Sequence, residues 1–358
     1  MTQVPTDYEA LLLVAFGGPE SLDQVEPFLE KVTAGHHIPA ERLAEVADRY
    51  ARVGGVSPIN ARLRNLVDSV GAELLAVGSR FPIYWGNRSA PPLLAETVAG
   101  MRDDGIGRAL AWIASPYSSN STCRRYREDI QAACAEIGSD APQIDVIRPH
   151  HDHPGLIRPA ADRLVEALRS LPTDDALVLF SAHSLPLDLA ATCDYEAQVN
   201  EAAGLVAERA GVTSSRRWEV VWQSRSGHPG VPWLEPDVCE RIQQLGEAGE
   251  RSVAVSPIGF PVENFEVAWD LDIEAAEQAG RAGMNFARAD CIDNDPRFVA
   301  MIKDLVIERT DPTKSAPAAL GRSGTRPHDC PAGCCPGPTR PRLTALGVHD
   351  RGNRGGYL

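Results

Sequence analysis

The chain has 358 residues, of which 43% are hydrophobic and 23% are charged, and its formal net charge at pH 7 is −14. A chain of this length has room for about two domains and a sizeable core. The acidic balance argues against binding nucleic acid through a basic face and against adsorption to anionic membranes. No apolar run approaches the roughly 20 residues that span a bilayer.

The N-terminal residues contain no basic segment followed by an apolar run, which is the pattern of a secretory signal. We therefore expect a cytoplasmic protein with no membrane insertion. In that reducing compartment the eight cysteines are not expected to form a disulfide framework, so a cluster of them indicates metal or redox chemistry.

Short apolar runs alternate with amphipathic helical segments, which is typical of a parallel α/β sheet. Two helices have clear ends: residues 40–53, which stop at Gly54, and residues 295–309, where Pro296 suits the first turn. The eight predicted strands are residues 10–16, 82–85, 108–114, 144–147, 176–180, 218–222, 252–256 and 285–289.

Four strands followed by four more predict two similar α/β halves, each a parallel four-stranded sheet flanked by helices. We expect an N-terminal half at residues 1–155, a C-terminal half at 156–310, and an irregular tail rich in Pro and Gly at 311–358. In open parallel sheets, ligands bind beyond the carboxyl ends of the strands. Function is therefore expected in the loops after the strands and in the cleft between the halves.

Two sets of polar residues follow strands of the second half. His183 lies in a Ser/His/Ser loop after strand 176–180, where it either binds a ligand or hydrogen-bonds a neighbouring loop. Glu266, Asp270 and Glu274 recur every four residues and therefore stack along one face of a predicted helix. Like charges at this spacing disfavour a helix by about 0.2–0.5 kcal/mol per pair, so such a ladder serves a solvated face or cations. Because it begins after a strand-end loop, we expect it to border the cleft.

An imidazole and a carboxylate across a cleft suit a divalent transition metal such as ferrous iron. Two protein ligands leave coordination positions open, which fits a metal in transit better than one held permanently. Other chemistries lack their signatures, because the chain has no Walker A loop and Ser184 lacks the G-x-S-x-G context of a serine hydrolase. The residues therefore favour metal delivery.

Five segments in the same order resemble the ferrochelatase family, over roughly residues 8–309. They are Phe-Gly-Gly-Pro at 16–19, Gly-Gly-Val-Ser-Pro at 54–58, Phe-Ser-Ala-His-Ser-Leu-Pro at 180–186, Trp-Gln-Ser-Arg at 222–225 with Pro-Trp-Leu at 232–234, and Phe-Glu-Val-x-x-Asp at 265–270. The resemblance implies an enzyme that inserts ferrous iron into a porphyrin, in a cleft between two Rossmann-like, chelatase-type halves.

The resemblance also implies roles for individual residues. His183 and Glu266 match the metal-binding histidine and glutamate, and Asp270 and Glu274 match an acidic line that guides the metal or removes protons. Either a neutral His183 or an ionised Glu266 takes the pyrrole protons, and the residues leave this choice open. The positions that match porphyrin-contacting residues are Ser57, Tyr126 and Phe16.

The segments 84–88 and 126–130 most resemble the actinobacterial branch of the family, whose substrate is coproporphyrin III. Heme biosynthesis then implies transient contact with neighbouring pathway enzymes. The alternatives are protoporphyrin IX, another tetrapyrrole or a metal such as cobalt, and a non-catalytic porphyrin- or heme-binding protein. The chain departs from the family at Glu263 and Asn264, where relatives usually have Asp-His, and in loop 31–37, where common basic residues are replaced.

Three cysteines are concentrated in the irregular tail, where a cytosolic protein has little structural reason to gather thiols. They are Cys330, Cys334 and Cys335. Three thiolates are one short of a four-cysteine cluster. The resemblance implies a 2Fe-2S cluster that also uses one upstream cysteine, with Cys123 preferred and Cys193 second. Free thiols, or a zinc site completed by a group such as His328, are the alternatives.

Overall fold

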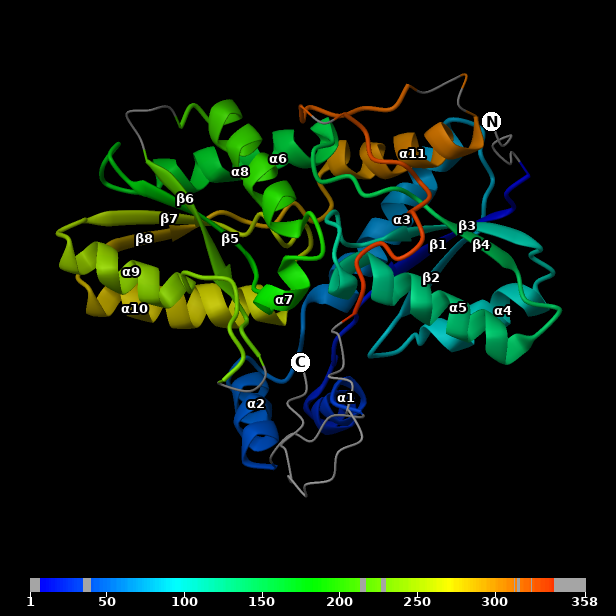
Figure 1. Ribbon diagram of the computed structural model, residues 1–358, viewed down its shortest axis with the longest axis horizontal. Helices are drawn as coiled ribbons and strands as arrows, with labels where there is room; N and C mark the ends of the chain where they lie inside the picture. Colours follow the sequence, from blue (N-terminus) through cyan, green and yellow to red (C-terminus); the bar gives the residue numbers. More distant parts are fainter. Residues whose placement is uncertain are drawn as a thin grey trace, which may run out of the picture.

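The computed structural model describes residues 7–34, 40–212, 217–226, 230–311, 313, 316–322 and 324–337. All eight predicted strands are confirmed, and they form two parallel four-stranded sheets (Figure 1). The first sheet has the order β2 (Ile83–Asn87), β1 (Ala10–Ala15), β3 (Arg108–Ile113) and β4 (Gln143–Val146). The second has the order β6 (Trp218–Gln223), β5 (Leu177–His183), β7 (Ser252–Ser256) and β8 (Asn285–Arg288). The two orders are equivalent, so the chain consists of two α/β halves of the same topology.

Helices cover both faces of each sheet, which explains why the central strands are apolar throughout. In Figure 1, α9 and α10 lie below the second sheet, and α6 and α8 lie above it. The α-helices are α1 (Val25–Val32), α2 (Ala40–Arg52), α3 (Ile59–Ala76), α4 (Leu94–Asp103), α5 (Arg125–Ile137), α6 (Pro154–Arg169), α7 (Leu187–Ala190), α8 (Tyr195–Arg209), α9 (Val238–Glu247), α10 (Ala276–Arg281) and α11 (Pro296–Thr310). The two helices with clear sequence ends, α2 and α11, match their predictions to within one residue.

Strand β1 shows how the two faces divide the core. Leu12 and Val14 belong to a cluster with side chains of α4 and α5, whereas Leu11 and Leu13 belong to the cluster that contains α3. That second cluster continues through α6, α8 and α11 to Phe180 of β5. The two halves therefore share one continuous core, and α11 packs against both α3 and α6. The division near residue 155 remains our proposal.

Two carboxylates of the acidic ladder, Asp270 and Glu274, lie on a π-helix, η3 (Val267–Ala275), and Glu266 directly precedes it. A second π-helix, η2 (Asn120–Arg124), leads into α5 and carries Cys123. In a π-helix the backbone hydrogen bonds join residues five apart, and such segments are frequent at functional sites. One pair of side chains in η3 is also joined across five residues: Trp269 Nε1 donates to Glu274 Oε1 at 2.8 Å.

The described part of the tail is irregular, as predicted, but it is packed against the body (Figure 1, orange to red). Arg124 Nη1 donates to the Cys334 carbonyl at 2.8 Å, and Asn120 Nδ2 donates to the Cys335 carbonyl at 3.1 Å. Arg127 donates to the carbonyl of His328. Residues 338–358 of the predicted tail lie outside the described residues.

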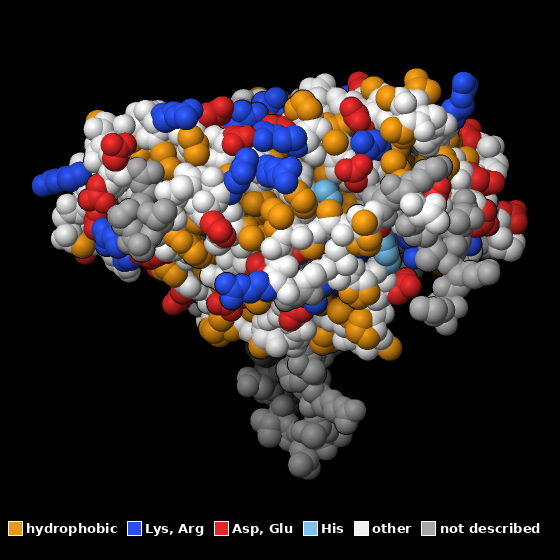
Figure 2. Space-filling model, turned by 90° about the horizontal axis from the view of Figure 1, so that it is seen from above, with side chains coloured by type: hydrophobic (Ala, Val, Ile, Leu, Met, Phe, Trp, Pro, Cys, Tyr) orange, Lys and Arg blue, Asp and Glu red, His pale blue; other side chains and the backbone are white. Residues whose placement is uncertain are grey.

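None of the helices in the described part of the chain combines the length and the apolar character that crossing a bilayer requires. The face formed by α6, α8 and α11 carries acidic and basic side chains intermixed with apolar ones (Figure 2). On this face the excess of negative charge is therefore not gathered into one patch.

Candidate active site

His183 and Glu266 meet where the second sheet ends. Strand β5 extends three residues further than predicted, so that His183 is its last residue and pairs with Gln223 of β6. The Nδ1 atom of His183 lies 2.6 Å from the Ser184 carbonyl oxygen, which makes Nδ1 the donor and turns Nε2 towards Glu266. Nε2 lies 3.6 Å from Glu266 Oε1. Burial lowers the pKa of His183, but the neighbouring Glu266 carboxylate outweighs it and raises that pKa to about 9.

Asp270 lies behind this pair and is 9% exposed. Its Oδ2 atom accepts hydrogen bonds from Ser224 Oγ and, at 3.3 Å, from Gln223 Nε2, both at the end of β6. Burial, together with the charges of Glu266 and Glu274, raises the pKa of Asp270 to about 7, although the bond from Ser224 opposes this shift. Asp270 can therefore exchange a proton near neutral pH.

Glu274, the third carboxylate of the ladder, turns towards α2. It accepts the hydrogen bond from Trp269 and lies 3.6 Å from Arg49 Nη1. The guanidinium carbons of Arg49 and Arg52 lie 5.5 and 4.8 Å from the centroid of the Trp269 ring. The carboxylates of Glu266, Asp270 and Glu274 thus have three different sets of partners.

A row of aromatic rings joins the first half to η3. Phe16 contacts Phe28 edge to face at 6.1 Å, and Phe28 contacts Tyr50 at 6.0 Å. Tyr50 stacks on Phe265 at 3.6 Å, and Phe265 is followed by Trp269 at 6.2 Å. Phe16 is 37% exposed, whereas Phe28, Tyr50 and Trp269 are buried, so Phe16 presents an aromatic face that a flat macrocycle can contact and the inner rings support it.

The other two predicted porphyrin-contacting residues are buried. Ser57 is 3% exposed, and its backbone N–H donates to the Pro19 carbonyl at 2.8 Å. Tyr126 is 8% exposed, and burial raises its pKa to about 12. The Arg88 guanidinium lies 4.9 Å from the Tyr126 ring and 5.8 Å from the Phe16 ring, and it forms an ion pair with Asp129. The Arg88 side chain therefore links the buried Tyr126 ring to the exposed Phe16 ring, because its guanidinium lies close to both.

Two loops of the first half depend on glycine. Gly17, next to Phe16, has φ +78°, and a Cβ atom there would lie 2.7 Å from the Asn87 side chain. Gly55 has φ +75°, and its Cβ would lie 2.5 Å from Leu22. Both positions combine a backbone conformation that favours glycine with a lack of space for any side chain.

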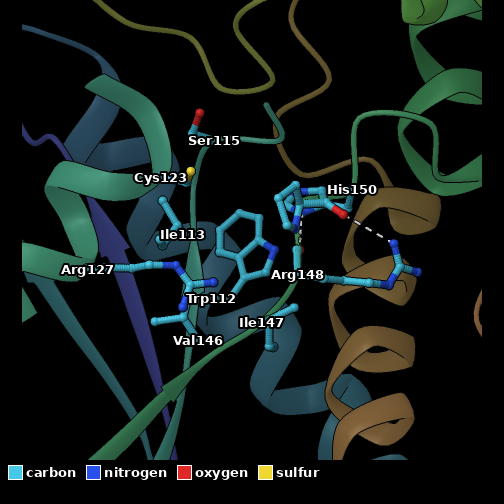
Figure 3. Close-up of a pocket in the computed structure, with 10 residues that line it drawn as sticks. Trp112, Ile113, Ser115, Cys123, Arg127, Val146, Ile147, Arg148 and His150 are labelled. Atoms are coloured by element: carbon cyan, nitrogen blue, oxygen red, sulfur yellow. Dashed lines mark hydrogen bonds between the residues drawn. The ribbon is translucent and has the colours of Figure 1, made fainter. Parts of the chain in front are cut away.

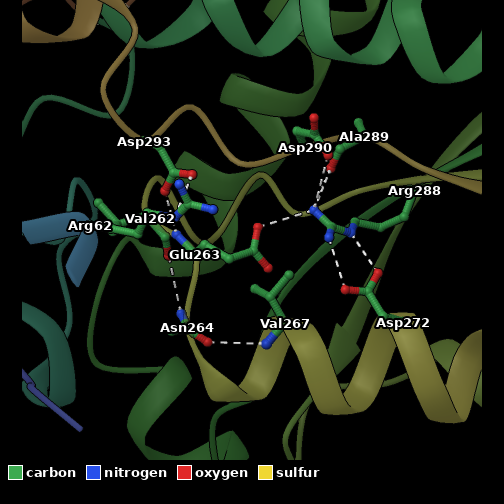
Figure 4. Close-up of polar contacts among 10 residues, drawn as sticks. All are labelled: Arg62, Val262, Glu263, Asn264, Val267, Asp272, Arg288, Ala289, Asp290 and Asp293. Atoms are coloured by element: carbon green, nitrogen blue, oxygen red, sulfur yellow. Dashed lines mark hydrogen bonds and ion pairs between the residues drawn. The ribbon is translucent and has the colours of Figure 1, made fainter. Parts of the chain in front are cut away.

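The family departure at Glu263 and Asn264 has a clear structural role (Figure 4). Asn264 Oδ1 accepts from the Val267 N–H at 3.1 Å, so it caps the helical residues that lead into η3. Glu263 forms an ion pair with Arg288, which also binds Asp272 of η3. These residues hold η3 against β8. In the other departing segment, loop 31–37, residues 35–37 lie outside the described residues.

Sequence reasoning missed three polar neighbours of the site: Gln223, Ser224 and Arg88. Gln223 and Ser224 belong to the Trp-Gln-Ser-Arg segment that carried the resemblance, and Arg88 ends segment 84–88. Their position after β6 and β2 was the available signal, because parallel strands place such residues at one edge of the sheet.

The four predicted cluster cysteines converge between η2 and the tail. The Sγ atoms of Cys334 and Cys335 lie 3.6 Å apart. Cys335 hydrogen-bonds to Cys123, which lowers the pKa of Cys123 to about 6, and Cys330 hydrogen-bonds to Cys334. Cys193 lies close enough for Cys123 and Cys334 to contribute to its raised pKa, for which burial is the main cause. A set of four thiols fits the ligand requirement of an iron-sulfur cluster.

Cys123 also borders a small pocket of the first half (Figure 3). Trp112 lies at its centre, with Arg127 on one side and Arg148 on the other. The Arg127 charge contributes to the lowered pKa of Cys123, after the hydrogen bond from Cys335. The thiols thus lie beside a basic side chain of the body.

Comparisons with known proteins agree with this architecture. The sequence profile of the family described as Ferrochelatase matches residues 8–310. A coproporphyrin III ferrochelatase of Mycolicibacterium smegmatis is 46% identical over 307 residues, which cover 84% of this chain and 89% of that protein. A coproporphyrin III ferrochelatase of Streptomyces coelicolor is 41% identical over 364 residues, covering 95% and 96%.

A solved structure described as SirB from Bacillus subtilis with Fe3+ has a TM-score of 0.50 and 12% sequence identity, and the match covers 85% of this chain and 96% of that one. At this identity the likeness concerns the fold alone. The profile match and the relatives above 40% identity decide the assignment. The chain belongs to the ferrochelatase family.

Proposed function

We propose that this chain is a lyase of heme biosynthesis that inserts ferrous iron into coproporphyrin III. The observation that carries the proposal is the pairing of His183 Nε2 with Glu266 Oε1 at 3.6 Å beside an exposed aromatic surface. An imidazole and a carboxylate suit ferrous iron, and the aromatic row suits a porphyrin ring. The relatives from M. smegmatis and S. coelicolor that are named for coproporphyrin III favour it over protoporphyrin IX.

In the proposed reaction, one ferrous ion enters the macrocycle and two pyrrole protons leave it. His183, with a pKa of about 9, carries a proton near neutral pH and must lose it before Nε2 can bind iron. Glu266 is then the proposed acceptor at the site, and Asp270 the acceptor behind it, because its pKa of about 7 allows it to take up and release a proton. Glu274 lies further along the same π-helix and would help to draw cations towards it.

Phe16 would contact the porphyrin face, and the aromatic row would support it from Phe28 to Phe265. Because Ser57 and Tyr126 are buried, we propose that they act at the edge of the macrocycle or through their neighbours, with Tyr126 acting through Arg88.

An anaerobic assay with ferrous iron tests the proposed function, by comparing coproporphyrin III with protoporphyrin IX through the loss of free-porphyrin fluorescence. Faster loss with coproporphyrin III is expected. Faster loss with protoporphyrin IX would reassign the substrate, and insertion of cobalt in preference to iron would reassign the metal. Tight porphyrin binding without any insertion would instead indicate a porphyrin-binding protein.

We also propose that Cys123, Cys330, Cys334 and Cys335 hold a 2Fe-2S cluster. The convergence of four thiols supports this ligand set. A zinc site completed by His328 is less favoured, because Nδ1 of His328 accepts from the Arg148 N–H and Nε2 lies 3.2 Å from Glu308 Oε1. When bound, such a cluster would clamp the tail to η2, and metal insertion does not require it to transfer electrons.

We further propose that the protein works in the cytoplasm, with transient contacts to the enzymes that supply its porphyrin and accept its product. The convergence of Cys123, Cys330, Cys334 and Cys335 supports this, because in a reducing compartment such thiols stay available to bind metal.

A further inference from the structure

A compact polar cluster lies on the loop before α6 and on α8. It consists of His151, Asp152 and Glu201, and one nitrogen or oxygen atom from each side chain lies within 4.8 Å of the others. His151 Nε2 lies 3.0 Å from Glu201 Oε2. The cluster therefore brings an imidazole and two carboxylates together with a spacing that one ion can bridge.

Asp152 is the unusual member of the cluster. It is 1% exposed, yet neither of its carboxylate oxygens has a hydrogen-bonding partner within the described part of the chain. Nδ1 of His151, which is 2% exposed, likewise has no partner among those residues. An ionised carboxylate in such a position is strongly unfavourable unless a cation compensates it. The cluster thus combines negative charge with free ligand atoms.

The neighbouring histidines, His150 and His153, make contacts outside the cluster. The ring of His150 stacks on Trp112 with centroids 5.7 Å apart. Nδ1 of His153 accepts from the Gly155 N–H at 3.0 Å and caps α6. Within this His-rich loop, it is therefore His151 and Asp152 that form the cluster with Glu201 of α8.

The tail closes over the cluster. The Leu320 N–H donates to the Asp152 carbonyl, and the Arg322 N–H donates to Glu201 Oε1, each at 2.9 Å. Between them lies Gly321, at which a Cβ atom would come within 2.7 Å of Asp152 Oδ2 and 2.8 Å of Glu201 Oε1. The carboxylates are thus pressed against the tail backbone, where a side chain larger than hydrogen does not fit.

We propose that His151, Asp152 and Glu201 bind a divalent transition-metal ion that fastens the tail to the body. Two carboxylates balance the charge of such an ion. The imidazole favours zinc, cobalt or iron over calcium and magnesium, which prefer oxygen ligands alone. This site is separate in its residues from the proposed iron-insertion site and from the cysteines, and it depends on neither.

A cobalt titration of the full-length protein tests the ligand set. The His183→Ala background removes the cleft ligand, and three variants are compared in it: Asp152→Asn, Gly321→Ala and the control Glu208→Gln, which removes a charge from an exposed residue of α8. We expect one Co2+ per chain, with visible d–d bands and no thiolate-to-cobalt charge-transfer band. Asp152→Asn should weaken binding by at least about tenfold, and Glu208→Gln should not change it. Equal affinity in the Asp152→Asn protein, or a single cobalt site whose bands report only cysteine ligands, would overturn the proposal.

Thermal unfolding separates a metal ligand from a merely structural residue. In the presence of a chelator, Asp152→Asn should unfold at the same or a higher temperature than the parent, because it removes an uncompensated buried charge. Added Zn2+ should raise the midpoint of the parent and of Glu208→Gln, but not that of Asp152→Asn. An equal loss of stability with and without Zn2+ would show that Asp152 has only a structural role.

Gly321→Ala keeps all three proposed ligands. It therefore tests whether the cluster binds a metal ion even if Asp152→Asn does not fold. Its added methyl group should weaken Zn2+ binding and expose the tail. Trypsin provides the readout, because Arg322 is exposed and lies beside the cluster. Zn2+ should slow cleavage after Arg322 in the parent protein and not in Gly321→Ala. If Zn2+ does not change the rate of cleavage after Arg322 in the parent protein, the proposed fastening of the tail is contradicted.

Discussion

Arg148 and Glu308 form a buried, two-point ion pair between the loop after β4 and the last turn of α11. Arg148 Nε lies 2.7 Å from Glu308 Oε1, and Nη2 lies 2.9 Å from Oε2. Their side chains are 1% and 6% exposed. His328 of the tail adds its Nε2 atom 3.2 Å from Glu308 Oε1. One carboxylate thus joins the first half, the last helix and the tail.

Replacing Glu308 with Gln should destabilise the fold by about 3 kcal/mol, because the buried Arg148 charge loses its partner. Burial raises the pKa of Glu308, but His328 and Arg148 outweigh it and lower that pKa from 4.5 to about 2. The stabilisation is therefore fully present above about pH 4.5 and is lost as the pH falls towards 2.

Urea unfolding at pH 7 and pH 3 measures both effects of Glu308→Gln. The difference between the parent and the variant should shrink at pH 3. An apolar double replacement, Arg148→Met with Glu308→Leu, should recover much of the loss. A single variant as stable as the parent at pH 7 would contradict the role assigned to this pair.

Replacing Glu266 with Gln should abolish most iron insertion while porphyrin binding persists. The change keeps the shape of the side chain but removes a metal ligand and a proton acceptor, so kcat/KM should fall at least about 10²-fold. The pKa of His183 should fall as well, because the charge of Glu266 raises it. Porphyrin fluorescence gives both binding and insertion, and an NMR titration of the histidines gives the pKa. Glu277→Gln, a change at an exposed glutamate eleven residues further along, is the control. Unchanged insertion in Glu266→Gln would favour the binding-protein alternative.

Replacing Asp270 with Asn should lower activity and raise stability at the same time. The pKa of Asp270 is raised from 3.8 to about 7, so the folded state holds this proton more tightly than the unfolded state does. The charge of Asp270 therefore costs stability increasingly as the pH rises from about 4 to about 7, by up to about 4 kcal/mol.

The midpoint of thermal unfolding should consequently be higher for Asp270→Asn than for the parent at pH 8, with little difference at pH 4. In the insertion assay, the rise in kcat/KM that accompanies deprotonation near pH 7 should disappear. If Asp270→Asn instead destabilises the protein at pH 8, its hydrogen bonds from Ser224 and Gln223 outweigh the cost of its charge.

The strands could be predicted because each buried strand requires a run of apolar residues, and Ala10–Ala15 or Ser252–Ser256 has no other explanation in an α/β chain. The π-helical form of η3 could not be predicted, because the spacing of Glu266, Asp270 and Glu274 is compatible with an α-helix as well as with a π-helix. Pairing of His183 with Gln223 lengthened β5 beyond its apolar run, so that Ser181 and His183 belong to the strand and Ser184 follows it.

The tail illustrates a different limit. Its course depends on single hydrogen bonds between distant residues, such as Arg124 to the Cys334 carbonyl and Asn120 to the Cys335 carbonyl. Composition predicts an irregular segment, but it carries no information about which surface that segment meets. The proximity of the Gly321 backbone to Asp152 and Glu201 was for the same reason invisible in the sequence.

The choice between Cys123 and Cys193 as the upstream cluster ligand gives the last prediction. The thiols of Cys123 and Cys193 both donate to backbone carbonyls, but Cys123 also hydrogen-bonds to Cys335, which lowers the pKa of Cys123 to about 6. Cys123→Ser should therefore abolish iron-sulfur absorption in anaerobically purified protein, and Cys193→Ser should retain it. Cys291→Ser, at a buried thiol of the second half, is the matched control.

Iron, sulfide and zinc analysis of the same samples identifies the bound group. About two iron and two sulfide per chain in the parent, lost together in Cys123→Ser, would match the proposed 2Fe-2S cluster. Zinc without sulfide would favour the zinc alternative, and loss of the cluster only in Cys193→Ser would make Cys193 the ligand. Because metal insertion transfers no electrons, Cys123→Ser should retain iron insertion at moderate temperature and lose the protection of its tail against proteolysis. Loss of insertion without any loss of tail protection would mean that the cluster acts on the cleft and not as a clamp.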